Sequence, residues 1–391
     1  MNDIIVRRGD QIMRTLSDTI ARLAAAQPHA APANATGRDR LVDMLVTGFN
    51  PGQLRARIYL PESLRPGAPL VVVLHGCTQT AAGYDHGSGW STLADRYGFA
   101  LLYPEQQRAN NANLCFNWFV PDDIRRDGGE VLSIRHMIEQ MIADHDLDPA
   151  RVFVTGLSAG GAMTAVMLAT WPEVFAGGAI VAGLPFASAR TMPQAFDRMR
   201  GHGGAGGEEL AGRVREASSH QGPWPILSVW HGTADHTVAA SNMEAIVDQW
   251  RLLQGIDETP AHTESLGGHH RRVWSDAHGN ARIEAHAIDG MGHGTPIAPG
   301  ATGCGMAGPY MLDVGVSSTQ HIAAFWGIAD APVADRVAPR AAVAEASPAA
   351  PRVAQPKPLR LPARPRPMAP VEAGGVKKVI EDALRAAGLM R

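Results

Sequence analysis

Five short, continuous apolar runs recur along the middle of the chain, and helical patterns lie between them. The runs are Leu70–Leu74, Phe99–Tyr103, Val152–Thr155, Ala179–Ala182 and Ile226–Trp230. Runs of this length and composition are typical of strands buried on both faces of a parallel sheet. Between two of them, residues 131–142 carry apolar side chains at helical spacing. This alternation predicts an α/β fold, a doubly wound and mostly parallel sheet with helices on both faces.

The composition divides the chain into four parts around this region. Residues 1–45 are predicted to form an amphipathic helix and a loop, because apolar residues recur at helical spacing from Ile5 to Leu23. Residues 46–328 are predicted to be the α/β domain. Residues 329–375 are rich in Ala and Pro, which cannot pack a core, so we expect a disordered linker. Residues 376–391 are expected to form a short amphipathic helix.

Composition also excludes several kinds of partner and site. A net charge of −3 gives no overall attraction to nucleic acid, and no apolar stretch has the length of a transmembrane segment. The 16 histidines and three cysteines lack the spacing of a metal or redox motif, so we expect no metal. The first 14 residues have no continuous apolar core. They therefore predict no signal peptide and, by default, a cytoplasmic location.

Residues 152–163 combine a strand pattern, a sharp turn and a helix-compatible stretch around Gly156-Leu-Ser158-Ala-Gly160. A strand that turns into a helix at Gly-x-Ser-x-Gly is the nucleophile elbow, which exposes the serine Oγ at the top of a sheet. The glycines are needed because a Cβ there would collide with the neighbouring strand and helix. We therefore predict that Ser158 is a catalytic nucleophile.

A serine hydroxyl needs a base, and the base needs an acid that orients it. In proteins with a nucleophile elbow the three residues occur along the chain in the order Ser, Asp, His, and the acid and the base each lie on a loop after a strand. Asp235 lies just after the run that ends at Trp230, and it fits the acid. His293 lies in a glycine-flanked turn after the alternating stretch 283–288, and it fits the base. The competitors are His231 for the base, Asp289 for the acid, and a helix-capping role for Asp235 near residue 241.

An oxyanion hole needs two backbone N–H groups that point to where negative charge develops. One should come from Ala159, the residue after the nucleophile. The second should come from the loop after an earlier strand, and His75-Gly-Cys77-Thr-Gln79 follows a buried run directly. We assign it to Cys77, with Gly76 shaping the turn. The alternative is a glycine turn without a catalytic role.

Several motifs stand in order along residues 45–328, and together they resemble the poly(3-hydroxybutyrate) depolymerase family of esterases. They are His75–Gln79, Cys115–Phe119, Gly156–Met163, His231–Asp235, Gly292–Gly294, Gly303–Gly305 and Ser317–Trp326. The resemblance implies an α/β-hydrolase catalytic domain over residues 46–328, no cofactor, and a triad of Ser158, Asp235 and His293. It also allows a disulfide between Cys77 and Cys115. Because members of this family are often secreted, an extracellular location is the alternative to the cytoplasm.

The family also includes feruloyl and acetylxylan esterases, so the resemblance leaves the ester open. The first hypothesis is hydrolysis of poly(3-hydroxybutyrate) or hydroxyalkanoate oligomers, and the second is removal of feruloyl or acetyl groups from polysaccharide. A third, from another class, is an inactive hydrolase scaffold that binds partners. Trp118, Trp90 and Gln79 are candidate substrate contacts, with Trp224 as a further aromatic candidate, since tryptophan offers a flat apolar face. The terminal helices suggest a homodimer or attachment to polymer granules.

Overall fold

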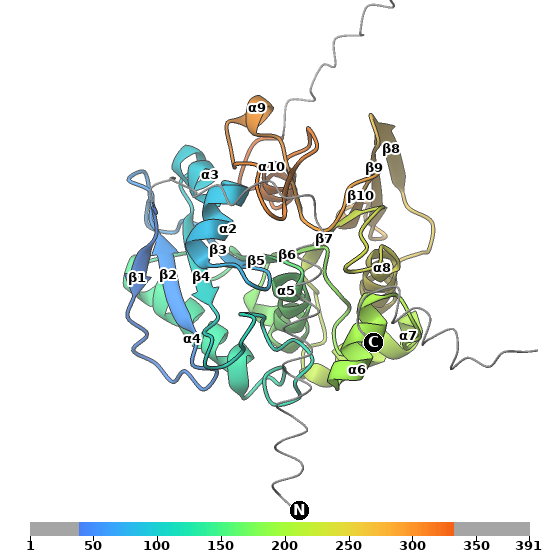
Figure 1. Ribbon diagram of the computed structural model, residues 1–391, viewed down its shortest axis with the longest axis horizontal. Helices are drawn as coiled ribbons and strands as arrows, with labels where there is room; N and C mark the ends of the chain where they lie inside the picture. The colour runs from blue at the N-terminus through green and yellow to red at the C-terminus, as the bar shows by residue number, and fades with distance from the viewer. Residues whose placement is uncertain (1–38, 332–391) are drawn as a thin grey trace, which may run out of the picture. The chain divides into compact units, whose positions relative to one another are not determined.

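A computed structural model of the chain describes residues 39–331 (Figure 1). The helix predicted within residues 1–38, nearly all of the predicted linker and the predicted C-terminal helix lie outside these residues. No helix among residues 39–331 is both long enough and apolar enough to cross a membrane.

The centre of the fold is a sheet of ten strands, in the order β1-β2-β4-β3-β5-β6-β7-β10-β9-β8. The strands are β1 (Val42–Met44), β2 (Arg55–Tyr59), β3 (Leu70–Leu74), β4 (Ala100–Glu105), β5 (Val152–Leu157), β6 (Gly177–Val181), β7 (Ile226–Gly232), β8 (His262–Leu266), β9 (His269–Ser275) and β10 (Ala281–Ile288). The six central strands are parallel to one another: β4, β3, β5, β6, β7 and β10. At each edge two further strands pair antiparallel with their neighbours, β2 and β1 beside β4, and β9 and β8 beside β10. The predicted α/β-hydrolase architecture is confirmed, and the five apolar runs form β3 to β7.

The sheet begins slightly before the predicted domain boundary at residue 46. Val42–Met44 forms β1, which pairs antiparallel with β2 through Val42 and Ile58. The short segment was expected to be loop because three residues are too few to show an alternating pattern. Its place in the sheet comes from hydrogen bonding to β2 rather than from its own side chains.

Helices cover both faces of the sheet (Figure 1). They are α2 (Ala81–Ser88), α3 (Trp90–Tyr97), α4 (Gly129–His145), α5 (Ala159–Thr170), α6 (Met192–Met199), α7 (Gly207–Ala217), α8 (Ser241–Gln254), α9 (Pro299–Thr302) and α10 (Ser318–Phe325), with a 3₁₀ turn at Pro172–Val174. A second, two-stranded sheet pairs β11 (Thr295–Ile297) with β12 (Met311–Asp313). The predicted helical pattern at residues 131–142 lies within α4.

Two hydrophobic cores lie on opposite faces of the sheet, because successive side chains of a buried strand point to opposite sides. Val72 of β3 joins the core that contains α4, α5, α7 and α8. Val71 and Val73 join the core that contains α2, α3 and α10. All three valines are fully buried, and this burial on both faces explains the continuous apolar run in the sequence.

Candidate active site

Ser158 lies at the junction between β5 and α5, in a strained backbone conformation. Its φ and ψ are 57° and −115°, a region that residues with a side chain rarely adopt. The turn is tight: a Cβ at Gly156 would lie 2.4 Å from the carbonyl oxygen of Gly160, and one at Gly160 would lie 2.3 Å from that of Leu74. Both glycines are therefore required, and the strand–turn–helix geometry is that of a nucleophile elbow.

Asp235 and His293 meet at the same edge of the sheet, because they follow the neighbouring parallel strands β7 and β10. Nδ1 of His293 is 2.7 Å from Oδ2 of Asp235. Oδ1 of Asp235 accepts the backbone N–H groups of Thr237 and Val238, each at 2.8 Å. Burial alone would raise the pKa of Asp235, but hydrogen bonds from His231, His293 and Val238 outweigh it and hold that pKa well below its ordinary value. The residue is therefore a carboxylate.

The structure assigns other roles to the competing residues. Nε2 of His231 lies 2.8 Å from the carbonyl oxygen of Val238 and 3.4 Å from Oδ2 of Asp235, so this histidine braces the β7 loop. Asp289 is exposed and pairs with Nε2 of His270 at 2.8 Å. The helix α8 is preceded by Ala240 without a side-chain cap, so Asp235 does not cap it.

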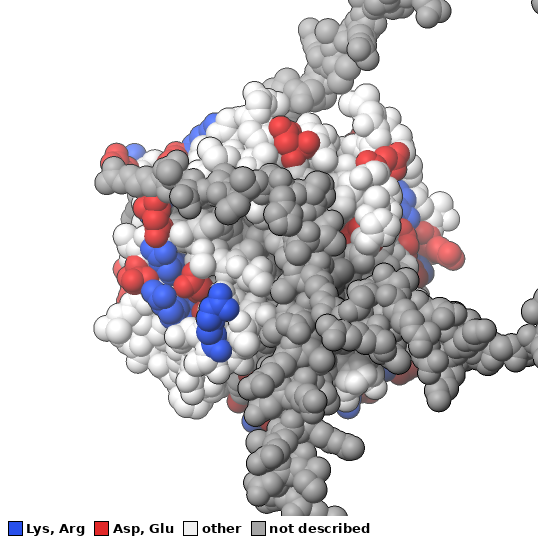
Figure 2. All heavy atoms as spheres, in the orientation of Figure 1, with Lys and Arg blue, Asp and Glu red and all other residues white. Residues whose placement is uncertain are grey.

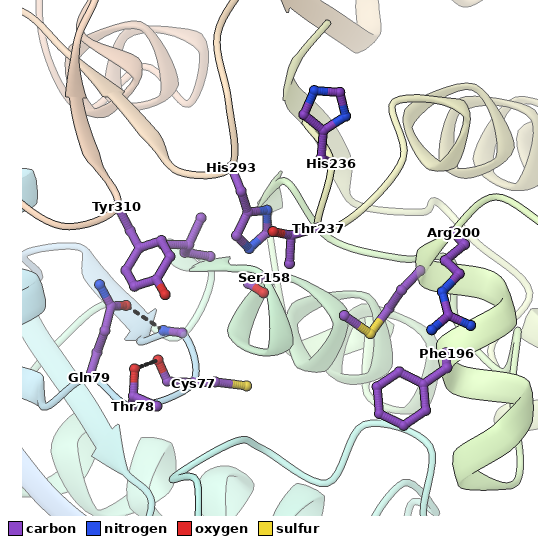
Figure 3. Close-up of a pocket in the computed structure, with 13 residues that line it drawn as sticks. Cys77, Thr78, Gln79, Ser158, Phe196, Arg200, His236, Thr237, His293 and Tyr310 are labelled. Carbon is purple, nitrogen blue, oxygen red and sulfur yellow. Dashed lines mark hydrogen bonds between the residues drawn. The ribbon is translucent and has the colours of Figure 1, made fainter. Parts of the chain in front are cut away.

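Ser158 and His293 line one pocket (Figure 3). The imidazole of His293 lies beside the Ser158 side chain in this view. Its Nδ1 is the atom that contacts Asp235. Since Nδ1 donates to a carboxylate, Nε2 is left as an acceptor on the side of the pocket. This arrangement can accept a proton from a serine hydroxyl.

The backbone N–H groups in the loop after β3 differ in whether they meet an acceptor within residues 39–331. The N–H of Gly76 donates to Oε1 of Gln79 at 2.8 Å, and that of Thr78 donates to the carbonyl of Asn113 at 2.7 Å. The N–H of Cys77, between them, meets no acceptor among residues 39–331. The N–H of Ala159 opens α5, where helices lack intrahelical acceptors. These two N–H groups are available to a ligand.

A disulfide joins Cys77 to Cys115. It ties the loop after β3 to the segment before α4, next to the hydrogen bond between Thr78 and Asn113. The side chain of Gln79 lines the pocket and at the same time fixes the N–H of Gly76. The loop that presents the free N–H of Cys77 is therefore held by a covalent bond and by two hydrogen bonds.

A family model described as "Esterase PHB depolymerase" matches residues 54–272, which is more than half of the chain. The chain belongs to this esterase family. It is therefore a hydrolase of carboxylic esters.

The relatives of this esterase act on different esters. It is 48% identical over 287 residues to "Poly(3-hydroxyalkanoate) depolymerase C" of Paucimonas lemoignei, a match that covers 72% of this chain and 68% of that protein. It is 33% identical over 258 residues to "Feruloyl esterase B" of Talaromyces stipitatus, with 64% and 70% covered. Among solved structures, an acetyl xylan esterase from Aspergillus awamori matches with a TM-score of 0.64 and 25% identity, over 74% of this chain and 99% of that one.

None of the tryptophans that the sequence suggested as substrate contacts of the esterase is among the described residues that line the pocket of Ser158. Trp90 is 2% exposed and stacks on Trp326 with a centroid distance of 5.9 Å, so it is a core residue. Trp118 is 6% exposed and belongs to a small hydrophobic cluster that also contains Ala159 and Met199. Trp224 packs edge-on against Trp250 of α8. The burial of Trp90 contradicts its expected contact with substrate. Trp118 clusters with Met199 of the pocket wall and Trp224 is only half-buried, so for these two the expectation stays a prediction.

Sequence reasoning missed most of the pocket wall of the esterase. Phe196, Met199 and Arg200 line it from α6 and its end, and Tyr310 lines it from the loop before β12. Tyr310 has a φ of 62°, and its ring lies edge-on to His293 with a centroid distance of 6.1 Å. The only sequence signal was the amphipathic pattern of α6, which does not distinguish a pocket wall from a core contact.

Proposed function

We propose that this esterase uses Ser158 as nucleophile, His293 as general base and acid, and Asp235 to orient and stabilise the imidazole. The observation that carries the proposal is the hydrogen bond between His293 and Asp235 behind a pocket that Ser158 also lines. The free N–H groups of Cys77 and Ala159 support an oxyanion hole at the same pocket.

In the proposed reaction, Oγ of Ser158 attacks the ester carbonyl while Nε2 of His293 takes the hydroxyl proton. The carbonyl oxygen gains negative charge, which the N–H groups of Cys77 and Ala159 stabilise. The carbon–oxygen bond to the alcohol then breaks, and His293 gives its proton to the leaving alkoxide. Water, deprotonated by His293, attacks the acyl-enzyme and releases the acid, and the proton returns to Ser158.

The proposed substrate is poly(3-hydroxybutyrate) or hydroxyalkanoate oligomers. The support is the identity of 48% to a poly(3-hydroxyalkanoate) depolymerase, against 33% to a feruloyl esterase. The second candidate is a feruloyl or acetylxylan esterase, which the TM-score of 0.64 to an acetyl xylan esterase favours. Clearing of a hydroxybutyrate polymer suspension, compared with release of ferulate and acetate from xylan, distinguishes them.

The test of the mechanism is Ser158→Ala. Hydrolysis of short p-nitrophenyl esters should be abolished, and a fluorophosphonate probe that labels the wild type should no longer react. Substantial residual turnover in a folded variant would refute the assignment of Ser158. The turnover would then come from another protein in the preparation, and the inactive scaffold would be favoured.

The disulfide bears on the proposed location. Disulfides persist in oxidising environments and are rare in the cytosol. The bond between Cys77 and Cys115 therefore supports the extracellular alternative over the cytoplasmic default. Mass spectrometry of the protein, unfolded and alkylated without reductant, should show Cys77 and Cys115 unmodified. Alkylation of both Cys77 and Cys115 would support the cytoplasm.

Association through the chain ends also remains a proposal, since these ends lie outside the described residues. Deletion of residues 332–391 should weaken binding to polymer granules while short-ester hydrolysis is retained. Size-exclusion chromatography of the same protein tests the homodimer. Unchanged granule binding and an unchanged elution volume would remove both ideas for the C-terminal part.

A further inference from the structure

The two ends of the pocket differ in chemistry (Figure 3). On one side of Ser158 lie Thr78, Gln79 and Tyr310, which are polar and uncharged. On the other side the end of α6 supplies Phe196 and Met199, which are apolar, followed by Arg200. No Asp or Glu lines the pocket, and Arg200 is its one permanently charged lining residue in the described part of the chain.

The guanidinium of Arg200 has no partner within residues 39–331. It forms no ion pair and no side-chain hydrogen bond there, and its guanidinium carbon lies 5.9 Å from the ring centroid of Phe196. By contrast, Arg198 on the same helix donates to the carbonyl oxygen of His202. Five N–H donors at the wall of a pocket are thus left for a ligand.

A guanidinium fits a carboxylate in charge and in geometry. A neutral ester offers no such group, but a hydroxyalkanoate oligomer ends in one, because each unit carries its carboxyl group at one end and its hydroxyl group at the other. The apolar side chain of Phe196 lies on the same side of the pocket as Arg200 (Figure 3), and Met199, which also lines the pocket, directly precedes Arg200 in the chain. Both apolar side chains suit the alkyl branches of such units.

We propose that Arg200 binds the free carboxylate of the substrate, so that the esterase prefers acid-terminated oligomers to neutral esters. This inference rests on the proposed function, since it names the form of oligomer that the Ser158 pocket takes. Binding of the terminal carboxylate at α6 places an internal ester of the same oligomer at Ser158. Because dissolved salt screens the attraction between Arg200 and the carboxylate, the preference for acids should fall as the salt concentration rises.

The experiment compares 3-hydroxybutyrate dimer, trimer and tetramer with the same oligomers capped as primary amides. Release of the monomer is measured by chromatography, and p-nitrophenyl acetate serves as the neutral reference. The wild type should show a higher kcat/KM for at least one acid than for its amide, by about fivefold for a solvent-exposed charge pair. Added sodium chloride should reduce this ratio.

Arg200→Gln should bring the ratio for acid over amide close to one and remove its salt dependence, with each rate expressed relative to hydrolysis of p-nitrophenyl acetate by the same variant. Arg200→Lys should keep part of the preference. The matched control is Arg151→Gln, an exposed arginine that precedes β5 at the end of the strand opposite Ser158; it should behave as the wild type.

The outcomes separate the two proposals. Equal kcat/KM for acid and amide at every length, or a preference that persists in Arg200→Gln, overturns the carboxylate site while the esterase mechanism stands. Hydrolysis of p-nitrophenyl acetate without cleavage of any oligomer overturns the hydroxyalkanoate substrate and the carboxylate site together. Oligomer hydrolysis by folded Ser158→Ala overturns the proposed mechanism.

Discussion

Nδ1 of His293 lies 2.7 Å from Oδ2 of Asp235, although 58 residues separate them in the chain. Both side chains are buried, each residue being 6% exposed. The contact is set by the sheet, because His231 of β7 pairs with Ala287 of β10 and both loops leave from the same edge. A carboxylate in this position fixes the tautomer of the ring and stabilises its charged form.

Asp235→Asn should lower kcat on p-nitrophenyl esters by about a thousandfold or more, because an amide no longer stabilises the imidazolium. The control is Asp289→Asn, which removes a carboxylate from a surface pair with His270 and should leave kcat unchanged. Steady-state kinetics of both variants, with circular dichroism to verify folding, make the comparison. A kcat for Asp235→Asn near that of the wild type would exclude Asp235 as the acid.

Gly160→Ala should disrupt the elbow, because its Cβ would lie 2.3 Å from the carbonyl oxygen of Leu74 and 2.5 Å from that of His75. We expect a loss of about 1–3 kcal/mol in the free energy of unfolding, as for other overpacked sites, together with loss of esterase activity. Gly212→Ala, in α7, meets nothing within 4 Å. It should raise the free energy of unfolding by about 0.5–1 kcal/mol. Urea denaturation measures the free energy of unfolding of both variants. If Gly160→Ala changed it in the same way as Gly212→Ala, the elbow would not be tight.

The double variant Cys77→Ala, Cys115→Ala should lose stability and kcat together. The disulfide closes a loop with a sequence separation of 38 residues, and removal of such a bond costs about 2–4 kcal/mol. The freed loop would also hold the N–H of Cys77 less firmly. Dithiothreitol should produce the same loss in the wild type and none in the double variant. Full activity of the reduced wild type would show that the loop needs no brace.

The thermal stability of the protein should fall as the pH decreases from about 6.5 to about 4. His269 and His321 surround His286, which stacks on Trp230 with a centroid distance of 3.7 Å. Burial first, and then the charge of His286, lowers the pKa of His269 and of His321 from 6.5 to about 4. The unfolded chain therefore binds more protons over this interval, and stability is lost as they bind.

His321→Gln should make the melting temperature less dependent on pH between these values. His278→Gln, in an exposed turn, is the control and should retain the wild-type dependence. The readout is the slope of melting temperature against pH. A loss of packing that is the same at every pH lowers the melting temperature but leaves this slope unchanged. Equal slopes in the two variants would contradict the assignment to the buried cluster.

The sequence predicted the fold well because strands buried on both faces must be continuously apolar, and β3 to β7 are. It also predicted that Ser158, Asp235 and His293 each follow a strand, and they do follow β5, β7 and β10 of the parallel part of the sheet; their catalytic roles stay a prediction. β1 was missed, since three residues show no period, and its pairing with β2 is a tertiary effect.

The pocket wall was not predictable from local pattern. Phe196 and Met199 lie on α6, where an apolar face is equally typical of a core contact. Tyr310 precedes a short strand whose partner, β11, lies right after the His293 loop. Trp90 shows the opposite error: a tryptophan suits a binding groove, but here its ring stacks on Trp326, more than 200 residues away in the chain. These assignments depend on contacts distant in sequence.

The helix α6 belongs to the long connection between β6 and β7, whereas Ser158, Asp235 and His293 follow β5, β7 and β10. One wall of the pocket can therefore be exchanged in evolution, or by design, without moving any group that we assign to bond cleavage. Replacement of α6 should therefore change the ester preference while Ser158, Asp235 and His293 stay in place.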